Sequence, residues 1–168
     1  MWHEVKDGHP VAMELFRRHY SYNIKRNQLK FWPNASDALF VGPGGKMVML
    51  TGDERALFVW RREQYTLNGQ HGVNCAVFRN EGTNAGRASA LIEEAKRLAW
   101  DRWPGERLYT YVDPSKVRRK RDPGRCFIKA GFRLCGRTKS GKLIFECLSE
   151  LAPGADGGAP DAASTKKP

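Results

Sequence analysis

The strongest hydrophobic pattern in the chain runs from Val73 to Trp103. It begins with a nearly continuous apolar run, Val73 to Phe78, of the kind found in strands buried on both faces. After a polar turn that contains glycine, apolar residues recur from Ala88 at intervals of three and four, and charged residues occupy the opposite face. The pattern ends at Trp103-Pro104-Gly105. We therefore expect a buried strand, a turn and a long amphipathic helix.

Shorter apolar and alternating runs predict the other elements. Further strands are expected at Trp2–Lys6, Lys46–Thr51, Ala56–Arg61, Arg107–Val112, Phe132–Gly136 and Leu143–Leu148, and further helices at Pro10–Tyr20 and Cys126–Ala130. Because a strand, a crossover helix and a second strand form a right-handed unit, the strands on either side of the long helix should be parallel. These elements predict an α/β (α+β) domain over residues 1–150, with a mixed central sheet of about six to seven strands and flanking helices.

Composition limits the class of protein. A chain of 168 residues with 40% hydrophobic composition is long enough for one core. Residues 151–168 have no apolar period and are rich in small residues, which predicts a disordered tail. The four cysteines lack the spacing of zinc or redox motifs, and neither a signal peptide nor a membrane-length apolar run is present. We therefore expect a cytoplasmic protein with no membrane association.

The charge balance favours a polyanionic partner. The chain has 29 Lys and Arg against 18 Asp and Glu, a net charge of +11, which favours nucleic acid through phosphate neutralisation. The cations cluster in two predicted loops. The first carries Lys25, Arg26, Lys30 and Trp32, and the second carries Lys116, Arg118, Arg119, Lys120, Arg121 and Arg125. Such clusters can bind phosphates while aromatic rings stack on a base. A charged face that only contacts solvent has the same composition.

The turn before the long helix is a candidate phosphate site, because unpaired N–H groups gather at a helix N-terminus. The order of the elements resembles the GNAT acyltransferase fold, in which an Arg/Gln-x-x-Gly-x-Gly/Ala loop holds the acyl-CoA pyrophosphate. Arg79-Asn80-Glu81-Gly82-Thr83-Asn84 matches this pattern except at its last position. The resemblance implies acetyl-CoA or another acyl or glycyl donor bound by Arg79, Asn80, Gly82, Thr83 and Asn84. An ordinary loop between a strand and a helix explains the same residues.

A narrower resemblance rests on three places in the chain. They are the pair His19-Tyr20, Ser89 in the long helix, and the segment Tyr109-Thr110-Tyr111-Val112-Asp113-Pro114 that leads to Cys126-Phe127-Ile128-Lys129-Ala130-Gly131-Phe132. Together they resemble the Mom-type DNA-modification proteins of bacteriophages, a divergent GNAT-like branch. The resemblance implies conversion of adenine in double-stranded DNA to an N6-carbamoylmethyl form, which protects the DNA from restriction, and it implies a bound iron.

The side chains at these places suit such chemistry. His19 can act as a general base or as a metal ligand. Tyr20, Tyr109 or Tyr111 can stack on a flipped base or donate a proton, and Asp113 can bind the exocyclic amine. The structural alternatives are a histidine that caps a helix, tyrosines that pack in the core, and an aspartate that starts a turn.

The sequence is compatible with three functions. The first is a DNA adenine-modifying transferase from a phage or prophage, with His19, Tyr20, Ser89, Tyr109, Tyr111 and Asp113 in its site. The second is an acyl-CoA-dependent N-acyltransferase that acts on a protein or a small amine. The third is a nucleic-acid-binding module without catalysis, and a homodimer is compatible with each of them.

Overall fold

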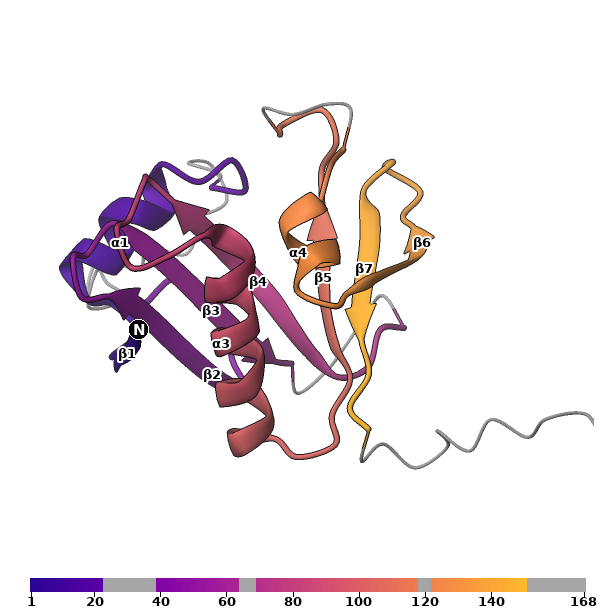
Figure 1. The fold of residues 1–168 in the computed structure, drawn as a ribbon, viewed down its shortest axis with the longest axis horizontal. Helices are drawn as coiled ribbons and strands as arrows, with labels where there is room; N and C mark the ends of the chain where they lie inside the picture. The colour runs from indigo at the N-terminus through magenta and orange to yellow at the C-terminus, as the bar shows by residue number, and fades with distance from the viewer. Residues whose placement is uncertain (23–38, 64–68, 118–121, 151–168) are drawn as a thin grey trace, which may run out of the picture.

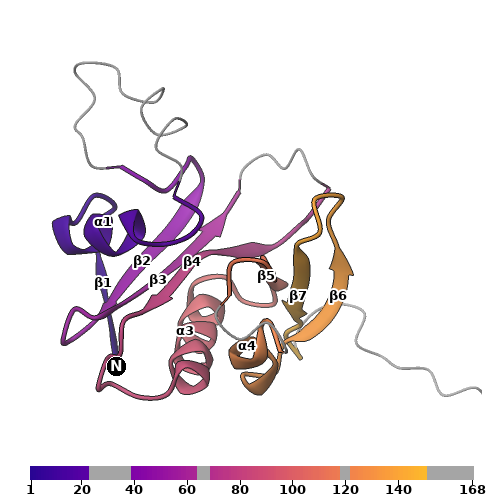
Figure 2. The same ribbon diagram turned by 90° about the horizontal axis from the view of Figure 1, so that it is seen from above.

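The computed structural model describes residues 1–22, 39–63, 69–117 and 122–150. Within them, one sheet carries helices on both faces (Figure 1, Figure 2). The strands are β1 (Trp2–Val5), β2 (Gly45–Thr51), β3 (Ala56–Arg62), β4 (Val73–Asn80), β5 (Leu108–Val112), β6 (Arg133–Arg137) and β7 (Leu143–Cys147). The helices are α1 (Pro10–Arg17), α3 (Ala88–Arg102) and α4 (Arg125–Lys129).

The sheet has seven strands in the order β1-β2-β3-β4-β5-β7-β6. Neighbouring strands are antiparallel except β4 and β5, which are parallel and are connected by α3. The predicted α/β class, the mixed sheet of about seven strands and the parallel pair are therefore confirmed. The predicted strands are all present, with small differences at their ends.

Helix α1 is shorter than its hydrophobic pattern predicted. It ends at Arg17 rather than at Tyr20, and the N–H of Arg18 bonds to the Phe16 carbonyl. The chain leaves the helix here because the side chains of His19 and Tyr20 turn toward the sheet: His19 is buried, and the Tyr20 hydroxyl reaches the backbone of β5. Helical spacing alone could not show this difference.

Each face of the sheet carries its own hydrophobic cluster. Along β2, Met49 packs with the residues of α3 and α4, whereas its neighbour Leu50 packs with those of α1. This alternation places α1 on one face and α3 with α4 on the other. Trp60 of β3 is fully buried, and its Nε1–H donates to the Ala95 carbonyl of α3 at 2.8 Å, which fixes the long helix against the sheet.

The parallel strands β4 and β5 are paired over a short distance only. Their register covers three residue pairs and ends where Cys75 lies opposite Thr110, although β4 continues for several residues. The next residue, Ala76, is an extra residue in the pairing of β4 with β3. Such a bulge bends its strand and interrupts the ladder. The two strands diverge beyond this point, as Figure 1 shows, and an opening forms between them.

Two other predictions concern membrane spans and residues outside the described ranges. Among the residues that the structure describes, no helix has the length and apolar character needed to cross a bilayer. The tail at residues 151–168 lies outside the described ranges, as do Lys25, Arg26, Lys30 and Trp32 of the first basic loop and Arg118, Arg119, Lys120 and Arg121 of the second.

We predict that Gly72→Ala destabilises the protein strongly. Gly72 precedes β4 with a φ of +112°, and a Cβ there would lie 2.2 Å from the carbonyl oxygen of Arg107. We expect the free energy of unfolding, measured with urea, to fall by more than about 2 kcal/mol. The control is Gly69→Ala, which has a φ of +69° but open space around the new Cβ, and which should cost about 1 kcal/mol. Equal losses in both variants would contradict the steric argument.

Candidate functional site

Two cavities meet at the opening between β4 and β5. A groove of about 470 Å³ lies on the face that carries α1, and a smaller cavity of about 140 Å³ is lined by residues of the opposite face. Tyr20 and Ala76 line both. The β4 bulge and the Tyr20 side chain therefore form the boundary between the two cavities.

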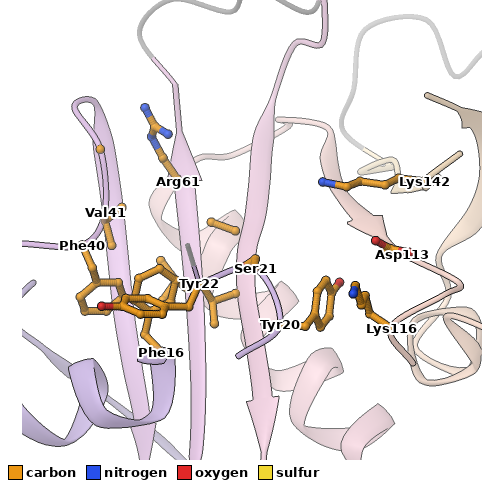
Figure 3. A pocket seen from close by; sticks show the side chains of 14 residues that line it. Phe16, Tyr20, Ser21, Tyr22, Phe40, Val41, Arg61, Asp113, Lys116 and Lys142 are labelled. Atoms are coloured by element: carbon orange, nitrogen blue, oxygen red, sulfur yellow. The ribbon is translucent and has the colours of Figure 1, made fainter. Parts of the chain in front are cut away.

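The groove combines an apolar, aromatic wall with a charged rim (Figure 3). Phe16 of α1 stacks on Phe40 with ring centroids 4.8 Å apart, and Tyr22 meets Phe16 edge-on at 5.4 Å. Val59 and Val77 supply the strand surface beneath them. The charged groups on the rim are Arg61, Asp113, Lys116 and Lys142. This arrangement suits a planar aromatic ligand that carries negative charge.

The cations on the rim differ in their partners. Arg61 pairs with Glu63 at 3.3 Å. Within the described ranges, the ammonium groups of Lys116 and Lys142 make no ion pair. Figure 3 shows both side chains near Asp113, on the side of the groove formed by the end of β5 and the start of β7. These two ammonium groups are therefore available to an anionic ligand.

The smaller cavity is mainly apolar and is bordered by β4, β5 and α4. Phe78 and Phe127 supply aromatic walls, and the thiols of Cys75 and Cys126 also line it. Burial raises the pKa of both thiols, so they remain protonated at neutral pH. A protonated thiol is a poor nucleophile, and these cysteines act as apolar lining.

His19 is held by hydrogen bonds at its ring. The backbone N–H of Ser21 donates to Nδ1 at 3.2 Å, and the Ser21 hydroxyl lies 2.7 Å from the same nitrogen. Because a backbone N–H can only donate, Nδ1 carries the lone pair and Nε2 carries the proton. The Phe78 carbonyl of β4 also hydrogen bonds with this imidazole. His19 therefore fastens the segment after α1 to the free edge of β4.

The same surroundings keep His19 neutral. Burial lowers the pKa of His19 to about 4, with a smaller contribution from the nearby Arg79 guanidinium. A neutral imidazole with its lone pair already accepting hydrogen bonds is unsuited to act as a general base or a metal ligand. The described residues also hold no group of three or more His, Cys, Asp or Glu that could bind a metal ion. These residues do not fit an iron site.

Tyr20 spans the opening beside His19. Its ring lies 4.3 Å from the His19 ring between centroids, and its hydroxyl donates to the Tyr111 carbonyl of β5 at 3.4 Å. Burial raises the pKa of the Tyr20 hydroxyl, although a hydrogen bond from the Asp113 N–H opposes this. At neutral pH Tyr20 is thus a phenol that donates hydrogen bonds.

Asp113 occupies the turn after β5 and faces the groove. Its Oδ1 accepts from the Ser115 N–H at 2.9 Å and from the Ser115 hydroxyl at 2.6 Å. These bonds lower the pKa of Asp113, and the charges of Lys142 and Lys116 lower it further. The turn role considered from the sequence is present, and Oδ2 accepts no hydrogen bond from the described residues.

Of the remaining predicted catalytic residues, Tyr109 and Ser89 lie apart from Tyr20 and Asp113, whereas Tyr111 lies beside Tyr20. Tyr109 is fully buried under Arg107, whose guanidinium lies 4.9 Å from its ring, and burial raises the pKa of Tyr109 to about 12. Tyr111 lines the smaller cavity and meets Tyr109 edge-on. Ser89 lies in the first turn of α3 and lines neither cavity. The structure therefore brings together His19, Tyr20, Tyr111 and Asp113.

The predicted phosphate turn is occupied by side chains of the protein. The N–H groups of Gly82 and Thr83 donate to Asn80 Oδ1 at 2.8 and 3.1 Å. The Asn84 N–H donates to the Asp53 carboxylate at 3.0 Å, and the Thr83 hydroxyl donates to the same carboxylate at 2.6 Å. These three N–H groups, which could bind a pyrophosphate, thus already donate to an amide oxygen and a carboxylate of the protein.

Arg79, the first residue of the same motif, is also engaged. Its Nε donates to Glu81 at 2.6 Å, and its Nη1 donates to the Arg18 carbonyl. Arg18 completes the cluster with its own bond to Glu81 at 2.8 Å. This cluster ties the end of α1 to the end of β4, and together with the occupied turn it does not fit an acyl-CoA pyrophosphate.

Sequence reasoning missed several residues of the groove. Arg61 and Lys142 lie at the ends of predicted strands, and their contribution depends on strand order, which the sequence pattern does not give. Phe16 was assigned to the core face of a helix, and it does pack there while its ring also borders the groove. Of the second basic cluster, Lys116 lines the groove, whereas Arg125 pairs with Asp122 at 2.8 Å.

No protein-family model matches the chain, and a search of curated proteins returned no significant match.

We predict that His19 makes the protein acid-sensitive. Because its pKa is about 4 in the folded protein and about 6.5 when unfolded, the unfolded chain binds the proton first as the pH falls. The contribution is fully present above about pH 6.5 and is lost toward pH 4, amounting to roughly 2 to 3 kcal/mol. His19→Gln should flatten this part of the pH profile of the unfolding free energy measured with urea.

The control for this prediction is His71→Gln, because the His71 side chain is exposed. This variant should retain the acid dependence of the wild type. A His19→Gln profile that still falls between about pH 6.5 and 4 as steeply as the wild type would contradict the assignment.

Proposed function

We propose that the protein is a DNA-modifying enzyme that converts an extruded adenine to an N6-modified base of the carbamoylmethyl type. The observation that carries this proposal is the groove, where aromatic side chains, two unpaired lysines, the Asp113 carboxylate and the Tyr20 phenol border one space. The resemblance of the motif residues to Mom-type proteins supplies the base and the product. Protection of DNA from restriction is the role that this product implies.

The size and lining of the groove support an extruded nucleotide as the ligand. Its volume of about 470 Å³ lies in the range of pockets that hold small molecules. Enzymes that act on a base take it out of the stack and hold it against aromatic or apolar side chains. The Phe16 and Phe40 rings offer such a surface, and Lys116 and Lys142 offer ammonium groups to the flanking phosphates.

Asp113 and Tyr20 have complementary roles in this proposal. The ionised Asp113 carboxylate has an oxygen that can accept a hydrogen bond from the exocyclic amine of adenine. When N6 bonds to the carbon of the donor, the leaving group departs with its electron pair, and N6 becomes acidic enough to give its proton to Asp113. Tyr20 retains its proton and donates a hydrogen bond to the Tyr111 carbonyl, so the tyrosine ring is held at the edge of the groove, where the base would lie.

The alternative of an acyl-CoA-dependent N-acyltransferase has less support. It shares the opening between β4 and β5, but the turn that would hold the pyrophosphate has its N–H groups bonded to Asn80 and Asp53. A binding module without catalysis would use the same cationic rim. In such a module the ionised Asp113 carboxylate would have no function, because its position between two lysines weakens phosphate binding.

The main test is nucleoside mass spectrometry of DNA from cells that express the protein. We expect an adenine derivative that is absent from cells with an empty vector. Asp113→Asn should lower its amount at least tenfold, because the amide cannot take up the proton. Asp122→Asn is the matched control, since Asp122 is an exposed carboxylate paired with Arg125 outside the groove, and it should leave the yield unchanged. Folded wild-type protein that leaves all bases unmodified would overturn the proposal.

A second test separates the proposal from the acyltransferase alternative. We expect millimolar acetyl-CoA to change the melting temperature by less than about 1 °C, because the N–H groups of Gly82, Thr83 and Asn84 already donate to Asn80 and Asp53. A ligand bound with micromolar affinity would raise it by several degrees under the same conditions. Such an increase, if abolished by Arg79→Ala, would favour the acyltransferase.

A further inference from the structure

We propose that the tip of the β6–β7 hairpin, residues 137–142, is a contact surface for the phosphate backbone of the DNA strand that enters the groove. This inference rests on the proposed function, and it assigns a part of the protein outside the motif residues to the DNA partner. The contacting groups are Arg137, Lys139 and Lys142.

The hairpin tip lies next to the groove. Val112 of β5 pairs with Leu143 of β7, so the residue before β7, Lys142, lies beside Asp113 at the end of β5. Lys142 lines the groove and points toward it in Figure 3. A strand of DNA whose base occupies the groove must therefore leave it close to this hairpin.

The turn holds its cations on a well-defined backbone. The Thr138 N–H donates to the Lys142 carbonyl at 2.8 Å, and the Gly141 N–H donates to the Thr138 carbonyl at 2.9 Å. The Thr138 hydroxyl accepts a further bond from the Lys142 N–H at 3.0 Å. Gly141 has a φ of +87°, which this closed turn requires. A fixed backbone lowers the entropy lost when the side chains bind an anion.

Among the described residues, Arg137 and Lys139 have no carboxylate partner at the tip, whereas Lys142 lies beside Asp113. At the start of β6, Arg133 pairs with Glu146 at 2.9 Å. At its other end, none of Arg137, Lys139 and Lys142 makes an ion pair within the described residues, and all three side chains are exposed. The sequence from Arg133 to Phe145 contains no acidic residue. Exposed cations without an ion pair, beside the place where an anionic ligand enters, are expected to contact phosphates.

The test is fluorescence anisotropy with a labelled duplex and the full chain, at salt concentrations from about 50 to 200 mM. The variant is Arg137→Gln with Lys139→Gln, which leaves the groove residues intact. Because each phosphate contact contributes about 0.9 to the slope of log affinity against log salt, we expect this slope to fall by about 2. We also expect about a tenfold loss of affinity at low salt.

The matched control is Lys6→Gln with Arg97→Gln, which removes the same charge from two exposed cations. Lys6 follows β1, at the opposite edge of the sheet, and Arg97 belongs to α3, on the face away from the groove. This control should retain the wild-type slope within about 0.5. Equal slopes for wild type and both variants, with tight wild-type binding, would overturn the hairpin proposal and leave the proposed function standing.

Three other outcomes of the anisotropy experiment also decide whether the hairpin contacts DNA. Equal reductions in the hairpin variant and the control would overturn the proposal, because they would show a response to net charge alone. Wild-type protein that does not bind duplex DNA at low salt would overturn both the hairpin proposal and the proposed function. A slope that changes in the hairpin variant only, with unchanged melting temperatures in all variants, would support the proposal.

Discussion

Backbone pairing between β4 and β5 ends at Cys75 and Thr110, and the candidate site depends on this ending. A parallel pair that continued along β4 would close the opening and remove both cavities. The bulge at Ala76 bends β4 where the pairing stops, so that the backbone beyond it faces a gap. A buried carbonyl facing a gap needs another hydrogen-bond donor, because leaving it unpaired costs about 1 to 3 kcal/mol. The segment after α1 supplies such donors.

His19 and Tyr20 supply these hydrogen-bond donors, one to each of the two strands that border the gap. The His19 imidazole bonds with the Phe78 carbonyl of β4, and the Tyr20 hydroxyl bonds with the Tyr111 carbonyl of β5. The pair thus connects the diverging strands and closes the space between the two cavities. This role explains why α1 stops at Arg17. It also assigns to His19 a structural function, whereas Tyr20 retains both a structural bond and a place in the groove.

The sequence predicted the sheet, the parallel pair and the long helix because each depends on local hydrophobic periodicity. It could not predict which distant residues would share a site. Asp113 and Lys142 lie side by side only because β7 is inserted between β5 and β6, an order that periodicity does not encode. The sequence also could not show that the turn before α3 is occupied. Asp53 precedes β3, and its bond to Asn84 depends on the pairing of β3 with β4. Motif spacing therefore indicated a phosphate loop where the fold supplies its own carboxylate.

The chain has a net charge of +11, and the ion pairs determine where on the described surface the positive charge stays unpaired. Several arginines of the scaffold, among them Arg18, Arg102 and Arg107, are paired with glutamates and contribute little to the external field. The exposed cations near the groove, Lys116, Lys142 and the hairpin residues Arg137 and Lys139, make no ion pair within the described residues. Lys116 and Lys142 lie near Asp113, and their charges stabilise its ionised form. In the proposed function, the carboxylate would thus act on a base at the place where these cations would attract the DNA.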